Sequence, residues 1–217
     1  MFFLECCCQN ADEALQSAMN GASRIELCED LACDGLTPSE ENVRATLAAV
    51  TIPVNVLIRC RAGNFVYTDD EVEAMVASIR RLRDLTVTLS DGSERRVNAV
   101  VIGALDADGR VDVAAVKRML AAWDNRPVTF HRAFDVCADP LAAFDTIAHL
   151  GIARILTSGH APSSTEGAAL LAQLVSRSAA TGGPVILVGG GVRPHNIDAL
   201  AATTAAQEFH SSCHSGW

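Results

Sequence analysis

Two Glu-x-Cys patterns occur at the ends of two short apolar segments of the chain. The first is Glu5-Cys6-Cys7 and the second is Glu26-Leu27-Cys28. Because side chains alternate along a β-strand, the glutamate and the last cysteine of each pattern share one face. Two thiolates on neighbouring strands can bind a soft ion such as Cu(I), which makes Cys7 and Cys28 candidate metal ligands. The alternative is that each cysteine is a small buried hydrophobic residue.

Two further basic side chains follow apolar segments. Arg59, at the end of Val54–Arg59, requires an acidic partner if it is buried, and Glu5 or Glu26 would supply one. It could instead bind a substrate carboxylate or phosphate. His131, near the end of Val128–Arg132, is a candidate general acid or base, or alternatively a core histidine satisfied by a neighbouring carboxylate.

The last two apolar segments end in Gly189-Gly190-Gly191 and in His210-Ser211-Ser212. Glycines allow backbone N–H groups to approach an oxyanion closely, and Ser158 and Ser211 add hydroxyl groups. The alternative is that the glycines only make a tight turn. The candidate acid, base and anchoring residues are therefore Glu5, Glu26, Arg59, His131 and His210. The candidate anion-binding residues are Gly189, Gly190, Gly191, Ser158 and Ser211.

The elements that must position these residues alternate regularly between strands and helices. The predicted strands are Phe2–Cys8, Arg24–Cys28, Val54–Arg59, Ala99–Leu105, Val128–Arg132, Arg154–Thr157, Val185–Val188 and Glu208–Ser211. The predicted helices are Asp12–Asn20, Ser39–Val50, Asp70–Leu85, Asp112–Trp123, Pro140–Leu150, Thr165–Ala180 and Pro194–Ala202.

Eight strands separated by seven helices predict a parallel α/β sheet, either a closed (β/α)8 TIM barrel or an open doubly wound sheet. The regular units, without GxGxxG after the first strand, favour the barrel, whose functional groups lie at the C-terminal ends of the strands. The whole chain, residues 1–217, is then one domain that lacks the final helix of the fold. Thr86–Arg96, around Asp91-Gly92, predicts a peripheral surface hairpin.

Composition narrows the classes of protein and of partner. The 217 residues are 49% hydrophobic and carry a formal net charge of −9, which argues against disorder and against nucleic acid as a partner. No apolar run reaches the ~18 residues that span a bilayer, and Met1–Glu5 lacks the basic start of a signal peptide, so no membrane association is expected. Eight cysteines without a CxxC pair argue against a zinc finger and for reduced thiols in the cytoplasm.

Long sequence blocks occur in the order found in one known family. They are Leu4-Glu5…Cys7, Gly21-Ala22-Ser23-Arg24-Ile25-Glu26-Leu27-Cys28, Gly35-Leu36-Thr37-Pro38-Ser39, Phe65-Val66-Tyr67-Thr68-Asp69, Val128-Thr129-Phe130-His131-Arg132-Ala133-Phe134-Asp135, Arg154-Ile155-Leu156-Thr157-Ser158-Gly159 and Glu208-Phe209-His210-Ser211-Ser212.

With these blocks the chain resembles the CutC copper-homeostasis family, which is unrelated to the choline lyase of similar name. The resemblance implies a cytoplasmic TIM barrel that handles copper and is often a homodimer. Cys7 and Cys28 fall on family positions proposed to bind Cu(I). The candidate acid, base and anchoring residues fall on polar positions that line the barrel mouth of the family. Asn64 replaces a family acid after the third strand, which weakens a role of that loop in cation binding or proton transfer.

Two functional hypotheses follow, and they leave open whether the chain is an enzyme. In the first, it is a cytoplasmic copper-homeostasis protein that binds Cu(I) through Cys7 and Cys28. In the second, it is a lyase or isomerase acting on a small phosphorylated or carboxylated substrate, with Glu26 or His131 as base and Arg59 as anchor. Gly190 and Ser211 would then hold the anionic group of the substrate.

Overall fold

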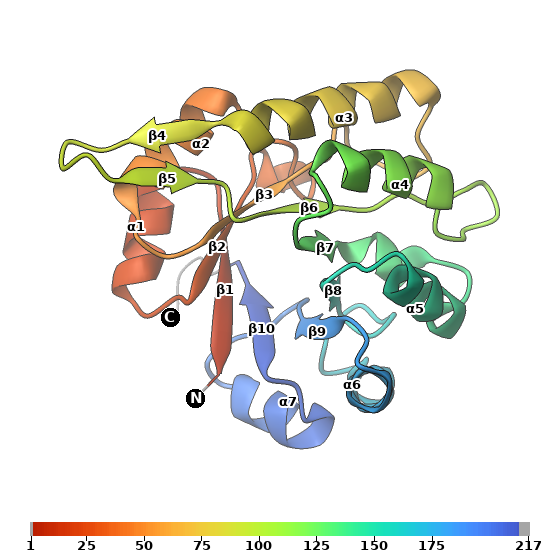
Figure 1. Ribbon diagram of the computed structural model, residues 1–217. Helices are drawn as coiled ribbons and strands as arrows, with labels where there is room; N and C mark the ends of the chain where they lie inside the picture. Colours follow the sequence, from red (N-terminus) through yellow and green to blue (C-terminus); the bar gives the residue numbers. More distant parts are fainter. Residues whose placement is uncertain (1, 213–217) are drawn as a thin grey trace.

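Eight parallel strands close into a barrel in the computed structural model, which describes residues 2–212. The strand order around the barrel is β1-β10-β9-β8-β7-β6-β3-β2, so the last strand pairs with the first. This closure confirms the TIM barrel and excludes the doubly wound sheet (Figure 1). The barrel strands are β1 (Phe3–Cys8), β2 (Arg24–Leu27), β3 (Val54–Leu57), β6 (Ala99–Ile102), β7 (Val128–Phe130), β8 (Arg154–Thr157), β9 (Val185–Val188) and β10 (Glu208–Ser211).

Seven α-helices surround the barrel within residues 2–212, and in that range none follows β10. Their starts carry capping residues: the Ser39 side chain accepts the N–H of Asn42, and Thr68 and Glu71 form a reciprocal capping box. The helices are α1 (Ala11–Met19), α2 (Glu40–Ala49), α3 (Asp69–Asp84), α4 (Val113–Ala122), α5 (Pro140–His149), α6 (Ala168–Thr181) and α7 (Ile197–Thr204), with short 3-10 helices η1 (Leu31–Cys33) and η2 (Arg132–Val136).

Side chains of the strands divide into two apolar clusters because successive residues face opposite sides of the sheet. The outward-facing residues, such as Ile25 and Leu27, pack against the helices in one large core. A small second cluster consists of Cys7, Cys28, Leu57 and Val101. The Glu-x-Cys alternation therefore places Cys7 and Cys28 together, apart from the core between strands and helices.

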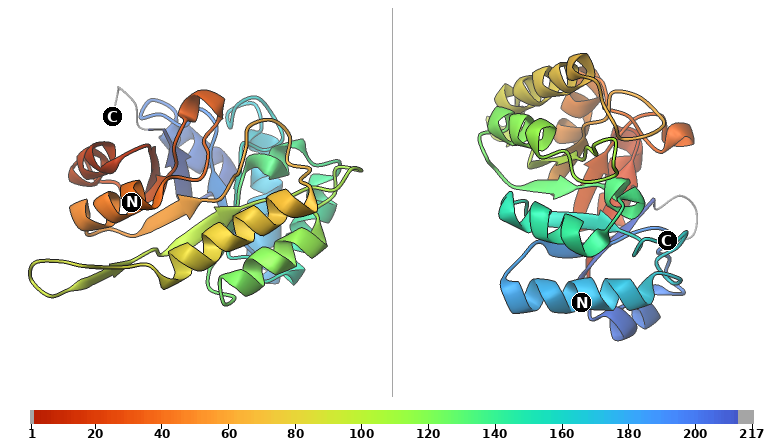
Figure 2. Two further views of the ribbon diagram at one scale, coloured as in Figure 1. Left: turned by 90° about the horizontal axis from the view of Figure 1, so that it is seen from above. Right: turned by 90° about the vertical axis from the view of Figure 1, so that its right-hand side faces the viewer.

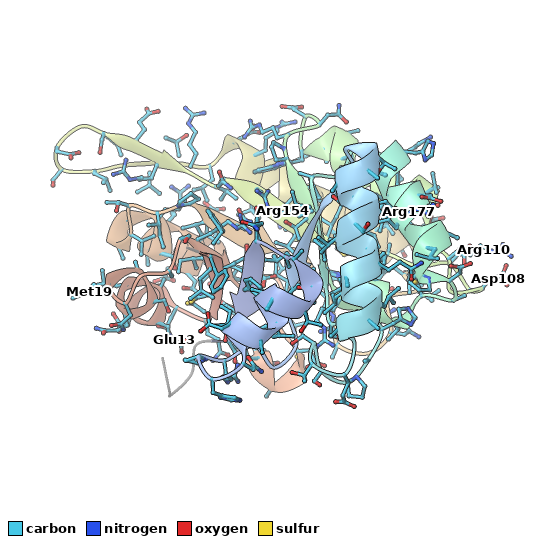
Figure 3. The ribbon with its side chains drawn as sticks, turned by 90° about the horizontal axis from the view of Figure 1, so that it is seen from below. Glu13, Met19, Asp108, Arg110, Arg154 and Arg177 are labelled. Atoms are coloured by element: carbon cyan, nitrogen blue, oxygen red, sulfur yellow. The ribbon has the colours of Figure 1, made fainter. Side chains whose placement is uncertain are left out.

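Buried and half-buried ion pairs connect the first, second, sixth and eighth barrel strands. Arg24 donates to the carboxylates of both Glu5 and Glu208, and Nε of Arg154 lies 2.7 Å from Oε2 of Glu208. Strand pairing places Glu5 opposite Arg24 on one side and opposite His210 on the other. Figure 3 shows Arg154 at the barrel strands.

The predicted hairpin is confirmed as β4 (Thr86–Thr88) and β5 (Glu94–Arg96), which pair antiparallel outside the barrel. It extends away from the body of the molecule and contributes no residue to the C-terminal ends of the barrel strands (Figure 2). No helix formed by residues 2–212 has the length and apolar character needed to cross a bilayer.

Candidate functional site

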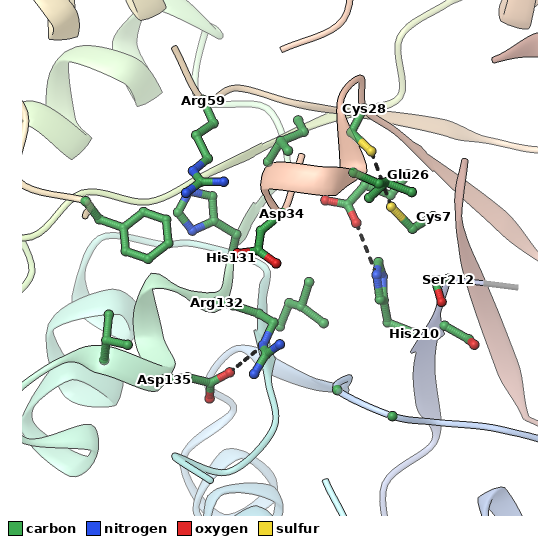
Figure 4. A pocket seen from close by; sticks show the side chains of 18 of the residues that line it. Cys7, Glu26, Cys28, Asp34, Arg59, His131, Arg132, Asp135, His210 and Ser212 are labelled. Carbon is green, nitrogen blue, oxygen red and sulfur yellow. Dashed lines mark hydrogen bonds and ion pairs between the residues drawn. The ribbon is translucent and has the colours of Figure 1, made fainter. Parts of the chain in front are cut away.

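The C-terminal ends of the barrel strands surround a cavity of about 510 Å³. This volume lies within the roughly 300–1,000 Å³ of small-molecule sites. Among the predicted site residues, those that line the cavity are Cys7, Glu26, Cys28, Arg59, His131, Gly190, Gly191, His210 and Ser211 (Figure 4). The structure does not place Glu5, Ser158 or Gly189 in the lining of this cavity.

The two candidate metal-binding thiols are in direct contact. Sγ of Cys7 lies 3.4 Å from Sγ of Cys28, and both residues are buried. Cys7 lies in β1 and stands opposite Glu26 of the neighbouring strand β2. Cys28 follows Glu26 by two residues. The hydrogen bond with Cys28, together with burial, raises the pKa of Cys7 well above its usual range. The Cys7 thiol is therefore protonated at neutral pH.

A carboxylate and an imidazole lie beside these thiols. Nε2 of His210 lies 3.3 Å from Oε2 of Glu26. One potential ligand atom from each of Cys7, Glu26 and His210 lies within 4.8 Å of the others. These three residues, with Cys28, form one side of the cavity and are called the thiol cluster below (Figure 4).

Glu5 is buried behind the cavity lining and contacts His210 of the thiol cluster. Its Oε1 lies 2.8 Å from Nδ1 of His210, and its Oε2 accepts from Arg24 and, at 3.2 Å, from Nδ2 of Asn55. Burial alone would raise the pKa of Glu5, but the hydrogen bond with His210 and the charge of Arg24 lower it to about 2. Glu5 is thus a charged positioning residue that is only 1% exposed, rather than a group at the cavity surface.

The two groups that Glu5 holds together have displaced pKa values. Burial raises the pKa of Glu26 to about 7, and the charge of Glu5 adds to that increase while the charge of His210 opposes it. Burial opposes the charged form of His210, but the carboxylates of Glu26 and Glu5 outweigh burial and raise its pKa. Glu26 can therefore gain or lose a proton near neutral pH.

Arg59 does not pair with Glu5 or Glu26, so the predicted internal ion pair is wrong. Its Nη1 donates to the carbonyl oxygens of Cys33 and Gly35 at 2.8 and 3.0 Å, and its Nη2 donates to that of Gly63 at 3.0 Å. The ion pair with Glu5 is made by Arg24, which stands directly opposite Glu5 in the neighbouring strand. Arg59 thereby holds the loops after β2 and β3 around the cavity.

His131 has no carboxylate partner among residues 2–212, contrary to the core-histidine alternative. Its Nδ1 accepts the N–H of Ala133 at 3.1 Å. Burial and the nearby charge of Arg59 lower the pKa of His131 to about 3, so the ring is neutral at pH 7. Gly103, after β6, makes room for the ring, because a Cβ there would lie 2.5 Å from Cε1 of His131.

Ser158 belongs to a network centred on Asp135 beside the cavity. The Asp135 carboxylate accepts from the Ser158 N–H and hydroxyl at 3.1 Å and from Nε of Arg132 at 2.7 Å. The Ser158 hydroxyl also lies 2.6 Å from the carbonyl oxygen of Ala161. Asp135 therefore fixes the loop after β8, and the Ser158 hydroxyl is engaged in that loop.

The glycine run is divided between sheet and cavity. The N–H of Gly189 donates to the carbonyl of Thr157 at 2.9 Å, which continues the sheet, whereas Gly190 and Gly191 line the cavity. Gly190 has φ +87°, and a Cβ there would lie 2.7 Å from Cβ of Ser158. The Ser211 hydroxyl donates to the carbonyl of Val192 at 2.9 Å.

Sequence reasoning missed Arg24, Arg193 and Asp34. Arg24 is the first residue of β2, so its contact with Glu5 is visible only once strand register is known. Arg193 follows the glycine run and lines the cavity, and its Nη2 donates to the Ser212 hydroxyl at 3.3 Å. Asp34 lines the cavity from a left-handed turn at φ 66°. An arginine two residues after the glycine run was a usable signal for an anion site.

A model of the CutC family matches residues 2–215. The chain belongs to the CutC family. Family protein CutC of Enterobacter sp. (strain 638) is 40% identical over 212 residues, covering 98% of this chain and 80% of that protein. Family protein CutC of Parabacteroides distasonis is 39% identical over 213 residues, covering 98% of this chain and 83% of that protein.

The solved structure of CutC from Streptococcus agalactiae, a protein named for copper homeostasis, has a TM-score of 0.87 and 31% identity, covering 98% of this chain and 99% of that one. A phosphonopyruvate hydrolase structure is also similar, with a TM-score of 0.64 and 16% identity, covering 96% of this chain and 75% of that one. At that identity the likeness concerns the fold alone. The predicted membership of the CutC family and the TIM barrel are confirmed.

Proposed function

We propose that this CutC family protein binds Cu(I) in the cytoplasm through Cys7 and Cys28. The observation that carries the proposal is the 3.4 Å contact between two buried thiol sulfurs on neighbouring strands. Cu(I) prefers soft thiolate ligands, and cytoplasmic thiols remain reduced. Nε2 of His210 and the carboxylate of Glu26 lie beside Cys7 and would supply further ligand atoms to the ion.

The thiol pair fits an ion after a small adjustment. Two thiolates that bind one ion through metal–sulfur bonds of about 2.3 Å, the length of zinc–thiolate bonds, stand roughly 4 to 4.6 Å apart. The sulfurs of Cys7 and Cys28 therefore need to move apart by roughly 1 Å from their contact of 3.4 Å. His210 is already oriented, because the contact between its Nδ1 and Glu5 leaves Nε2 facing the thiol cluster.

The test is an anaerobic Cu(I) titration against a competing chelator. We expect one Cu(I) per chain, with tight binding lost in the Cys7→Ser/Cys28→Ser variant. The matched control is Cys33→Ser/Cys60→Ser, which removes two free cysteines that do not line the cavity. Equal affinity of the native protein and the Cys7→Ser/Cys28→Ser variant would overturn the proposal.

The carboxyl of Glu26 favours a second candidate function, proton transfer on a small phosphorylated or carboxylated substrate by a lyase or isomerase. Burial brings the pKa of this cavity-lining group to about 7, where it can both accept and donate a proton. Glu26 is a better base than His131, whose ring has a pKa of about 3 and whose Nδ1 is already engaged.

Solvent exchange tests this second function. Small phosphorylated and carboxylated carbonyl compounds are incubated with the protein in D2O, and incorporation of deuterium next to the carbonyl group is followed by NMR. We expect incorporation with the native protein and none with Glu26→Gln. Incorporation that persists in Glu26→Gln, or no incorporation into any compound, would count against the function.

A further inference from the structure

His131 lines the cavity and holds a buried hydrogen-bond donor without a partner among residues 2–212. Its side chain is 5% exposed, and because Nδ1 accepts from Ala133, the neutral ring carries its proton on Nε2. Nε2 has no hydrogen-bond partner among residues 2–212. A buried donor without an acceptor costs about 1–3 kcal/mol. An oxygen atom of a bound ligand would remove that cost.

A second unpartnered donor belongs to Arg59, which is 4% exposed and also lines the cavity. Its Nη1 and Nη2 donate to backbone carbonyls, but its Nε has no partner in the described part of the chain. The ring of Phe65 lies 5.1 Å from Cζ of Arg59 and 5.0 Å from the ring of His131. Arg59, Phe65 and His131 all line the cavity and are called the donor wall below. Figure 4 shows Arg59 and His131 next to each other.

Another part of the cavity carries positive charge and backbone N–H groups. Gly190 and Gly191 line it, and their N–H groups have no acceptor within residues 2–212. The Nη2 atom of Arg132 lies 3.6 Å from the position that a Cβ of Gly190 would occupy. Arg193 completes this group, which we call the anion rim: Arg132, Gly190, Gly191 and Arg193.

The charges that line the cavity favour an anion although the chain as a whole is acidic. Three arginines line it: Arg59, Arg132 and Arg193. Among the lining acids, Asp135 is already bonded to Arg132 and to Ser158, and Glu26 faces His210. Asp34 is the remaining acid named in the lining, and it is exposed. Because Asp135 neutralises Arg132 and Glu26 faces His210, Arg59 and Arg193 remain against Asp34, an excess of one positive charge.

We propose that the cavity binds a small organic anion whose oxyanion head contacts the anion rim and whose second oxygen accepts hydrogen bonds from the donor wall. The head is a phosphate or a carboxylate, and the second oxygen belongs to a carboxylate or carbonyl group. This inference rests on the second candidate function and narrows its substrate to an anion with two oxygen-bearing ends. Binding of the anion requires neither catalytic turnover nor bound copper, because neither the donor wall nor the anion rim includes Cys7 or Cys28.

Calorimetry with four probes tests the proposal. Phosphoglycolate and malonate each carry two oxygen-bearing ends, whereas inorganic phosphate and acetate carry one. We expect at least one two-ended probe to bind about tenfold tighter than its one-ended counterpart, as the added hydrogen bonds imply. Preference between phosphoglycolate and malonate identifies the head. If neither two-ended probe binds more tightly than phosphate or acetate, the proposal is overturned.

Variants assign the binding to the two groups. His131→Phe removes the donor and should weaken the two-ended probes by about tenfold while leaving phosphate unchanged. Arg132→Gln, at an exposed side chain, should weaken every probe, and Arg110→Gln is its matched control because Arg110 is an exposed arginine paired with a nearby aspartate. Unchanged binding in both His131→Phe and Arg132→Gln would contradict the assignment. Anion binding retained in Cys7→Ser/Cys28→Ser would separate it from the copper proposal.

Discussion

Oε1 of Glu5 lies 2.8 Å from Nδ1 of His210, although 205 positions separate the two residues. The contact exists because the first and last strands pair and close the barrel, with Glu5 directly opposite His210. It turns the other imidazole nitrogen, Nε2, toward Glu26. A carboxylate behind a histidine is a common way to orient a metal-binding or proton-transferring imidazole.

Glu5→Gln should be strongly destabilising. The variant leaves the buried guanidinium of Arg24 without the charge of Glu5, and breaking a buried pair in this way costs about 3–5 kcal/mol. Denaturant unfolding measures the change in the free energy of unfolding. Glu40→Gln is the control, because its pair with Arg44 is solvent-exposed and contributes about 1 kcal/mol or less. Similar losses in the two variants would contradict the structural role of Glu5.

Cu(I) affinity should increase with pH. Because the pKa of Cys7 is raised well above its usual range, this thiol is protonated at neutral pH and must release its proton when the ion binds. Each proton released makes the affinity about tenfold stronger per pH unit. Chelator competition at pH 6, 7 and 8 measures this dependence. An affinity that does not change over this range would exclude a thiol that is protonated before binding.

His131 should make the protein less stable as pH falls below neutrality. The unfolded chain takes up a proton near the ordinary histidine pKa of 6.5, whereas the folded chain does so only near 3. The unfolded state therefore binds more protons between these values, and stability decreases by up to about 1.4 kcal/mol per pH unit. Unfolding free energies of the native protein and His131→Phe from pH 7 to pH 4 check this. A difference between the two proteins that stays constant with pH would disprove it.

Gly103→Ala and His131→Ala should be energetically coupled. A Cβ at position 103 would lie 2.5 Å from Cε1 of His131, so the ring must move, at a cost of about 1–3 kcal/mol. In the His131→Ala background the same substitution should cost much less, because the ring is absent. A double-mutant cycle of unfolding free energies gives the coupling. Additive effects would mean that the two residues do not constrain each other.

Elements and their order were predictable because each carries a local periodic signal. The predicted strand Arg154–Thr157 coincides with β8, and the predicted helix Asp70–Leu85 differs from α3 by one residue at each end. The predicted helix Thr165–Ala180 begins later, at Ala168, because residues 163–166 form a turn in which the Ser163 hydroxyl accepts the N–H of Glu166. Such turns depend on local hydrogen bonds that periodicity does not show.

The sequence indicated which polar residues lie near the strand ends, but not which atoms each of them contacts. Glu5, Arg59 and Ser158 were selected as polar residues at strand ends, yet Glu5 lies beneath the cavity and the Ser158 hydroxyl is bonded within its loop. Arg24 and Arg193 were missed because their partners are distant in sequence or follow from loop geometry. Contact partners depend on strand register, which a single sequence does not encode locally.

The sequence by itself determined that Cys7 and Glu5 share one face of a strand, since alternation is a property of any extended chain. It also favoured the barrel over an open doubly wound sheet, because the strand–helix units are regular and no GxGxxG follows the first strand. Only the tertiary structure decided that Arg24 rather than Arg59 neutralises Glu5, and that Nε2 of His131 lacks a partner in the described residues. Those outcomes depend on which strands become neighbours when the barrel closes, and closure is a property of the whole chain.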